Sequence, residues 1–103
     1  MAGSIALQHL GSWARVTLSH PGKLNAIDIA MWQALRAAFE RLQALPEADA
    51  PHAIVVCGAD GQFASGGDIA EFAEFRFAEA RLHHFHEHIV APALHAMLDC
   101  DIP

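Results

Sequence analysis

The stretch Phe63-Ala64-Ser65-Gly66-Gly67-Asp68-Ile69 decides how this chain is interpreted. It follows an apolar run at residues 53–57 and a glycine-containing turn, and a segment with helical spacing begins at Asp68. Small residues at such a strand-to-helix junction let a ligand approach the backbone closely. The first N–H groups of the helix have no partner within the helix. The stretch therefore predicts a site at which backbone N–H groups bind an anion or a developing oxyanion.

The elements on either side predict an α/β chain in the order β-β-α-β-α-α. Alternating residues at 5–10 and 14–19 predict a β-hairpin. Asp28 is a suitable N-cap for a helix that ends near Leu45. The run at 53–57 lacks polar alternation, which is expected of a strand covered on both faces. Helical spacing continues over 68–77 and 78–98, where Pro92 should kink or divide the second helix. Within the first helix, an apolar stripe is expected to face the core: Met31, Trp32, Leu35, Phe39 and Leu42.

Composition excludes several classes of protein. The 103 residues suffice for one small domain, and six Lys and Arg against twelve Asp and Glu argue against a nucleic-acid binder. No apolar run approaches the ~18 residues of a membrane helix, so we expect no membrane partner. Two cysteines and no visible secretory signal favour a reducing, cytoplasmic location. Residues 99–103 end abruptly for a domain, and we expect the chain to be part of a longer polypeptide.

A second motif, His20-Pro21-Gly22-Lys23-Leu24-Asn25-Ala26-Ile27, follows the predicted hairpin. It resembles the R-P-x-x-x-N-A-L segment of the crotonase superfamily, also called the enoyl-CoA hydratase/isomerase family. The stretch at 63–69 is similar to the F-x-A-G-x-D-[LI] segment of the same family. Each motif alone is moderately specific, but both occur in the right order with the expected elements between them. The resemblance covers roughly residues 5–102. It implies a crotonase-like spiral of ββα turns, of which residues 1–103 form the N-terminal part of a single domain, truncated before the second oxyanion-hole segment.

The resemblance also implies an activity in fatty acid metabolism. Family members bind acyl-CoA thioesters and stabilise a thioester enolate with two backbone N–H groups. The resemblance therefore implies that this chain derives from an enoyl-CoA hydratase, which is a lyase, or from an enoyl-CoA isomerase. The first oxyanion-hole donor would be the N–H of Ser65, where the family usually has Ala. Lys23 is placed to meet a CoA phosphate, although a solvated loop lysine is the alternative. No metal and no cofactor are expected, since coenzyme A is part of the substrate, and the complete protein would form a homotrimer or a dimer of trimers. The residues implied to line the substrate are Lys23, Leu24, Ala26, Ser65, Gly66, Gly67, Asp68 and Ile69.

Other interpretations remain open. In the family, the second donor and the acid/base residues lie later, so the 103 residues alone are predicted to be inactive. The alternative is that the chain is a non-catalytic CoA-binding or assembly fragment. A truncated chain is also expected to expose apolar surface and to associate. Asn25 is expected to bond nearby backbone.

The histidines and acids of the C-terminal half carry a weaker signal. Helical spacing places His84, His88 and His95 on one face, as in a zinc-binding helix. The order is not H-E-x-x-H and no Cys joins the group, so a His-rich surface helix is the favoured interpretation. The acids Glu71, Glu74 and Glu79 are expected to form a solvated helix face.

Overall fold

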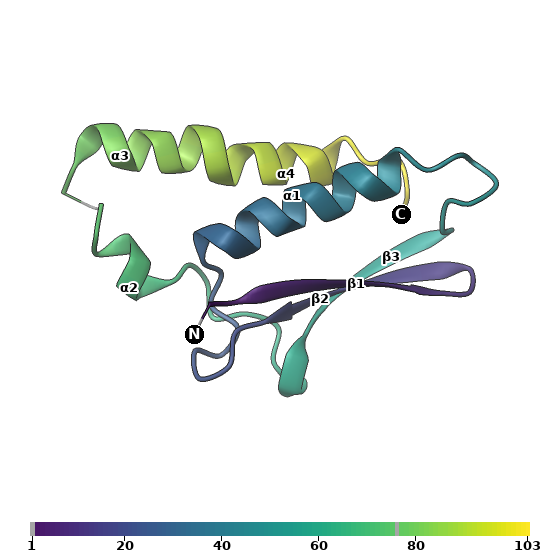
Figure 1. The fold of residues 1–103 in the computed structure, drawn as a ribbon, viewed down its shortest axis with the longest axis horizontal. Coiled ribbons are helices and arrows are strands. Elements are labelled where there is room, and N and C mark those ends of the chain that lie inside the picture. Colours follow the sequence, from purple (N-terminus) through teal and green to yellow (C-terminus); the bar gives the residue numbers. More distant parts are fainter. Residues whose placement is uncertain (1, 76) are drawn as a thin grey trace.

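A three-stranded sheet forms one layer of the molecule (Figure 1). The computed structural model describes residues 2–75 and 77–103. Strands β1 (Ser4–Leu10) and β2 (Trp13–Ser19) form the predicted antiparallel hairpin, and β3 (Ala53–Gly58) lies parallel to β2. The strand order is β1-β2-β3. The α/β class expected from the sequence is confirmed.

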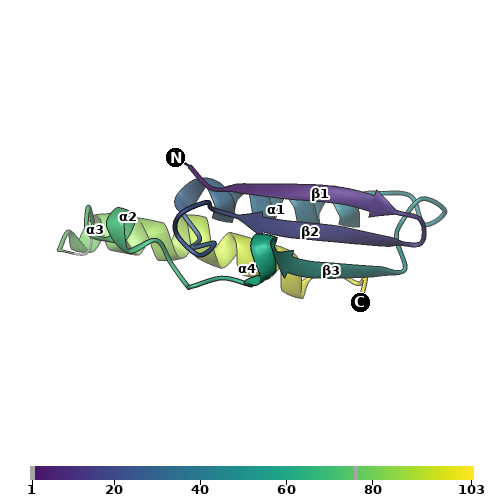
Figure 2. The ribbon, with the colours of Figure 1, turned by 90° about the horizontal axis from the view of Figure 1, so that it is seen from below.

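Helix α1 (Ile29–Gln43) packs on one face of this sheet and closes the core (Figure 2). It begins where expected, because the side chain of Asp28 accepts a hydrogen bond from the N–H of Met31 at 2.8 Å. Alternate residues of β2 point toward the helix and are buried, as period-two patterning predicts. The buried residues of the core cluster all belong to β2 and α1: Ala14, Val16, Leu18, Met31, Leu35, Phe39 and Leu42.

Strand β3 differs from the expectation. Val55 is 45% exposed, and within residues 2–75 and 77–103 no helix covers the sheet face opposite α1 (Figure 2). The prediction of a strand buried on both faces is therefore wrong for this structure. Its apolar run is typical of a strand that is covered on both faces. Among the described residues, helices cover only the face on which α1 packs. At the outer edge of β3, the N–H of Ile54 donates to the carbonyl of Pro103 at 2.7 Å.

The C-terminal half forms a helical layer beside α1 (Figure 1). Helix α2 (Ile69–Phe72) is shorter than the predicted helix at 68–77, because the chain turns after Phe72 and buries Phe75. The second predicted helix is a continuous run of α3 (Glu79–His84), the π-helical segment η2 (Phe85–Val90) and α4 (Ala91–Leu98). Pro92 lies in the first turn of α4. The run changes from π-helix to α-helix just before it without a break, so the expected division of this helix at Pro92 is not observed. Among the described residues, none of the helices combines the length and apolarity that a bilayer crossing demands.

Candidate functional site

The two motifs singled out in the sequence lie side by side. The N–H of Ile27 donates to the carbonyl of Gly66 at 2.8 Å, and the N–H of Asp68 donates to the carbonyl of Ile27 at 3.0 Å. These bonds form an isolated parallel bridge between Ile27 and Gly67. Segments about 40 residues apart in the chain are thus joined by backbone hydrogen bonds, and their backbones form one continuous wall.

Asn25 holds the loop that precedes the glycines. Its side chain is buried, accepts a hydrogen bond from the N–H of His20 at 3.0 Å, and donates to the carbonyls of Ala59 and Gln62 at 2.9 and 3.0 Å. Its φ of 58° is a left-handed conformation that Asn tolerates better than most residues. The structural role expected for Asn25 is confirmed.

A pocket of ≈ 260 Å³ opens at the junction of the two motifs. The residues around it are Lys23, Ala26, Ser65, Gly67, Asp68, Ile69 and Ala70. All the predicted substrate-lining residues except Leu24 and Gly66 are therefore brought together. Leu24 is 59% exposed beside the pocket, and Gly66 has a φ of 102°, which only glycine adopts without strain.

Two residues that line this pocket have backbone N–H groups without a protein partner among the described residues. Within the described residues, the N–H groups of Ser65 and Gly67 donate to no protein acceptor, whereas that of Asp68 is used by Ile27. The Ser65 hydroxyl donates to the carbonyl of Lys23 at 3.0 Å. The loop therefore has two backbone N–H groups without a protein acceptor among the described residues, and one of them belongs to Ser65.

Asp68 connects the loop to Lys23 and to the following helix. Its carboxylate accepts hydrogen bonds from Lys23 Nζ at 3.2 and 3.3 Å and from the N–H groups of Ala70 and Glu71 at 3.0 and 3.4 Å. Burial alone would raise the pKa of Asp68, but the ammonium of Lys23 and the two backbone donors outweigh it, and the net pKa is lowered. Asp68 is the N-cap of α2 and remains ionised.

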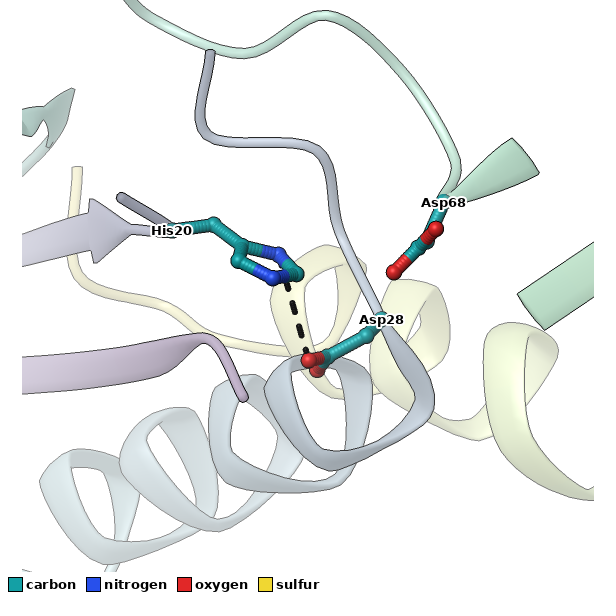
Figure 3. A group of neighbouring side chains, drawn as sticks. All are labelled: His20, Asp28 and Asp68. Carbon is teal, nitrogen blue, oxygen red and sulfur yellow. Dashed lines mark ion pairs between the residues drawn. The ribbon is translucent and has the colours of Figure 1, made fainter. Parts of the chain in front are cut away.

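Sequence inspection missed a buried cluster of His20, Asp28 and Asp68 (Figure 3). Their potential ligand atoms lie within 4.8 Å of one another, and His20 Nδ1 is 3.9 Å from Asp28 Oδ2. These atoms already have partners, since His20 Nδ1 lies 2.7 Å from the carbonyl of Ala26, which can only accept a hydrogen bond, and Asp28 Oδ2 accepts from the N–H of Gly3 at 2.8 Å. A cation would have to displace Lys23 from Asp68 as well. The cluster fits a hydrogen-bonded junction between loops better than a metal centre.

Glu71 departs from the expected solvated face. Its Oε1 accepts a hydrogen bond from the N–H of Ile29 at 2.7 Å, at the start of α1. Burial raises the pKa of Glu71, and the nearby charges of Asp28, Asp68 and Glu74 raise it further against the opposing effect of the Ile29 N–H. Glu74 and Glu79 are exposed, as expected.

Glu71 lines a second, largely apolar pocket of ≈ 170 Å³ on the same turn as the first. The two pockets share Gly67, Asp68 and Ile69. Three aromatic rings form its far wall: Phe75 packs edge-on against Phe72 at 5.4 Å and tilted against Phe85 at 4.8 Å between ring centroids. The two pockets therefore meet at the glycine turn.

The three-histidine zinc site is contradicted. The rings of His84 and His88 stack at 5.0 Å between centroids, but the one group of three metal-ligating side chains found among the described residues is His20, Asp28 and Asp68. The π-helical segment η2 lies between His84 and His95 and changes the number of residues per turn, so 3.6-residue spacing no longer predicts a shared face. His95 instead borders a groove of ≈ 530 Å³ between α1 and α4, which contains none of the predicted site residues.

Comparisons with known proteins bear on the same residues. A family model described as enoyl-CoA hydratase/isomerase matches residues 13–96. An enoyl-CoA hydratase/carnithine racemase from Magnetospirillum magneticum superposes with a TM-score of 0.83 and 33% identity over 96% of this chain and 36% of that structure. An enoyl-CoA hydratase/isomerase family protein from Hyphomonas neptunium gives 0.83 and 29% over 96% and 37%.

A curated relative matches more locally. A peroxisomal bifunctional enzyme from Danio rerio is 39% identical over 62 residues, which are 60% of this chain and 8% of that protein. The chain thus spans little more than a third of the length of the solved structures it resembles and a small part of this relative.

Proposed function

This chain belongs to the enoyl-CoA hydratase/isomerase family, and on that premise we propose that it binds acyl-CoA thioesters and stabilises the thioester enolate through backbone N–H groups. The N–H of Ser65 is one donor of the oxyanion hole. Leu24, Ala26, Gly66, Gly67, Asp68 and Ile69 line the thioester and its pantetheine arm. The reaction proposed is hydration or double-bond isomerisation of an enoyl-CoA.

The unpaired N–H of Ser65 carries this proposal. It belongs to a pocket that contains almost every residue implied by the two motifs, and its neighbour Gly67 supplies a further unpaired N–H. An enolate formed from a thioester places negative charge on oxygen, and one preorganised donor lowers such a barrier by about 3 kcal/mol. Because the donor is a backbone group, Ser65 replaces the usual Ala without loss of this function.

The aromatic pocket is the proposed site of the acyl group. Its volume of ≈ 170 Å³ is close to the ~150 Å³ of an engineered apolar cavity that holds one benzene. It shares the turn at Gly67 with the pocket that contains Ser65, so a thioester carbonyl at this turn would have its acyl chain on the aromatic side. The pocket therefore favours short acyl chains or a single ring.

The proposed domain and assembly of the complete protein rest on the same family membership. Residues 1–103 form the N-terminal part of a single crotonase-like domain, and a later segment supplies the second oxyanion-hole donor and the acid/base residues. The complete protein is a cytoplasmic homotrimer or dimer of trimers with no metal. Residues 1–103 alone are inactive, and the exposed side chains of Val55, Ile69 and Phe77 favour association.

The test replaces the peptide bond at Ser65 by an ester in the complete protein, which removes the N–H and leaves the side chain. Crotonyl-CoA hydration or isomerisation of 3-enoyl-CoA is then measured beside Ser65→Ala, which keeps the N–H. We expect kcat to fall roughly 10²- to 10³-fold for the ester and much less for Ser65→Ala. Equal losses in the two variants would contradict the assignment of the Ser65 N–H, and CoA binding without turnover in the wild type would favour the non-catalytic binding module.

A further inference from the structure

We propose that Lys23 is a positioning residue that holds the oxyanion loop, residues 65–68, in its working shape, and that its ammonium is not primarily a ligand of a CoA phosphate. The inference rests on the proposed function only in assigning the loop its role. It concerns a contact that joins the two motifs and that neither motif reveals by itself.

Lys23 is tied to both ends of the oxyanion loop. The Ser65 hydroxyl donates to the Lys23 carbonyl at 3.0 Å, and Lys23 Nζ donates to the two carboxylate oxygens of Asp68 at 3.2 and 3.3 Å. Gly66 and Gly67 lie between these two attachments and carry no side chain that could hold them. Glycines lose more conformational freedom on ordering than any other residue. The backbone bonds to Ile27 hold Gly66 and Asp68, and the two attachments at Lys23 add the side-chain contacts that fix Ser65 and the carboxylate of Asp68.

The backbone of Lys23 is itself fixed. Its N–H donates to the carbonyl of His20 at 3.1 Å, and its carbonyl also accepts the N–H of Ala26 at 3.0 Å. The neighbouring Asn25 is buried and bonded to three backbone groups. Lys23 therefore extends from a rigid turn, which suits an anchor for a flexible glycine loop.

Charge and burial favour the contact with Asp68 over a contact with phosphate. The side chain of Asp68 is 8% exposed and that of Lys23 is 42% exposed. Among the described residues, Lys23 is the ammonium that Asp68 contacts, and the second buried carboxylate, Asp28, lies in the same cluster. Moving Lys23 Nζ to a phosphate would leave a buried carboxylate without its cation, which is costly. The same carboxylate caps the first turn of α2, so the contact with Lys23 links the anchor to the start of this helix.

The first experiment separates the two roles of Lys23 with a pair of substrates in the complete protein. Crotonyl-CoA carries nucleotide phosphates, and crotonyl-pantetheine carries none. For Lys23→Met, we expect kcat to fall roughly 10- to 100-fold by the same factor with both thioesters, while KM for crotonyl-CoA changes little. Lys23→Arg should recover part of kcat, and Arg41→Gln, which removes an exposed charge elsewhere, should change neither parameter. A rise in KM for crotonyl-CoA alone, with crotonyl-pantetheine unaffected, would overturn the proposal.

The second experiment needs no turnover. Amide hydrogen exchange at Ile27, Asp68 and Ala70, whose N–H groups are hydrogen-bonded at the loop, is measured by NMR in the substrate-free protein for the wild type, Lys23→Met, Ser65→Ala and Arg41→Gln. We expect both loop variants to exchange at least several-fold faster at these amides and Arg41→Gln to match the wild type. Unchanged exchange in Lys23→Met would overturn the anchoring role. If the wild type binds neither thioester, the proposed function fails, and the exchange result still decides the role of Lys23.

Discussion

The layer made of β1, β2 and α1 buries its own apolar side chains, whereas the helical arm, defined as α2, α3, η2 and α4, leaves several of its own in solvent. Leu18, Met31 and Leu42 in the layer are at most 1% exposed. In the arm, Ile69 and Leu98 are 80% and 79% exposed. The layer thus contains the core, against which Ala96 and Met97 of the arm also pack, while the arm displays apolar surface that the described residues do not cover.

This difference explains where the candidate site lies. The proposed oxyanion loop belongs to the segment between β3 and α2. One side of this segment is hydrogen-bonded to Ile27 and Asn25, which lie between β2 and α1, and the other side adjoins the arm. The pocket at Ser65 lies on the first side, and the aromatic pocket is formed mainly by residues of the arm. The proposed oxyanion donor therefore lies on the better supported side, and the proposed acyl site lies on the less supported side.

The largest expected effect comes from the same substitution made in each region. Leu42→Ala removes a side chain that is 0% exposed and should lower the free energy of unfolding by about 2–5 kcal/mol, because it loses buried area and leaves a cavity. Leu98→Ala, at 79% exposure, should change it by less than about 0.5 kcal/mol. Urea unfolding of the complete protein measures both. Similar losses at the two positions would mean that the arm is as well packed as the layer, contrary to the comparison.

A smaller effect is expected at the junction between the regions. Asn25→Ala leaves the N–H of His20 and the carbonyls of Ala59 and Gln62 without their side-chain partner, which should cost about 1–3 kcal/mol. Gln62→Ala is the matched control, because it removes an exposed amide and keeps the backbone carbonyl. The same unfolding measurement applies. Equal stability of the two variants would show that Asn25 does not hold the loop.

The smallest effect is a change in pH dependence at Glu71. Because the pKa of Glu71 is raised in the folded protein above its ordinary value of 4.5, the native state binds more protons than the unfolded state between the two pKa values. Stability therefore falls as pH rises through that window. Glu71→Gln keeps an acceptor for the Ile29 N–H and removes the charge. It should gain less than about 1 kcal/mol at pH 7 and show a flatter profile.

Thermal unfolding from pH 4 to 8 tests this prediction, with the exposed Glu47→Gln as the control. Asp68 has the opposite sign: its lowered pKa contributes stability that is present above the ordinary value of 3.8 and lost as pH falls through the folded pKa. A Glu71→Gln variant that is less stable than the wild type at pH 7 would contradict the prediction, because it would show that the carboxylate of Glu71 stabilises the native state.

Local features were predictable from the sequence, and distant contacts were not. The N-cap at Asp28 and the apolar stripe from Met31 to Leu42 are encoded within a few turns of one helix, and both are confirmed. The grouping of Ser65 with Ala26 was inferred from two motifs, not from physics alone, and the structure places both in one pocket.

The remainder depends on how segments meet. His20, Asp28 and Asp68 belong to three separate segments, and nothing local signals that they share a buried cluster. Glu71 looks like any acid on a helix until α1 is placed beside it. The prediction that His84 and His95 share a helix face assumed an unbroken α-helix. The π-helical segment η2 lies between them, so that assumption does not hold.

The most direct test of the central claim is the carbonyl stretching frequency of crotonyl-CoA, labelled with ¹³C at the thioester carbon and bound to the complete protein, recorded by isotope-edited infrared spectroscopy. Donation from the Ser65 N–H should polarise the carbonyl and shift the band to lower wavenumber than in water, and the ester at residue 65 should reverse part of that shift while Ser65→Ala preserves it. A bound carbonyl with the frequency found in water, or a shift unaffected by the ester, would contradict the assignment of Ser65 to the oxyanion hole.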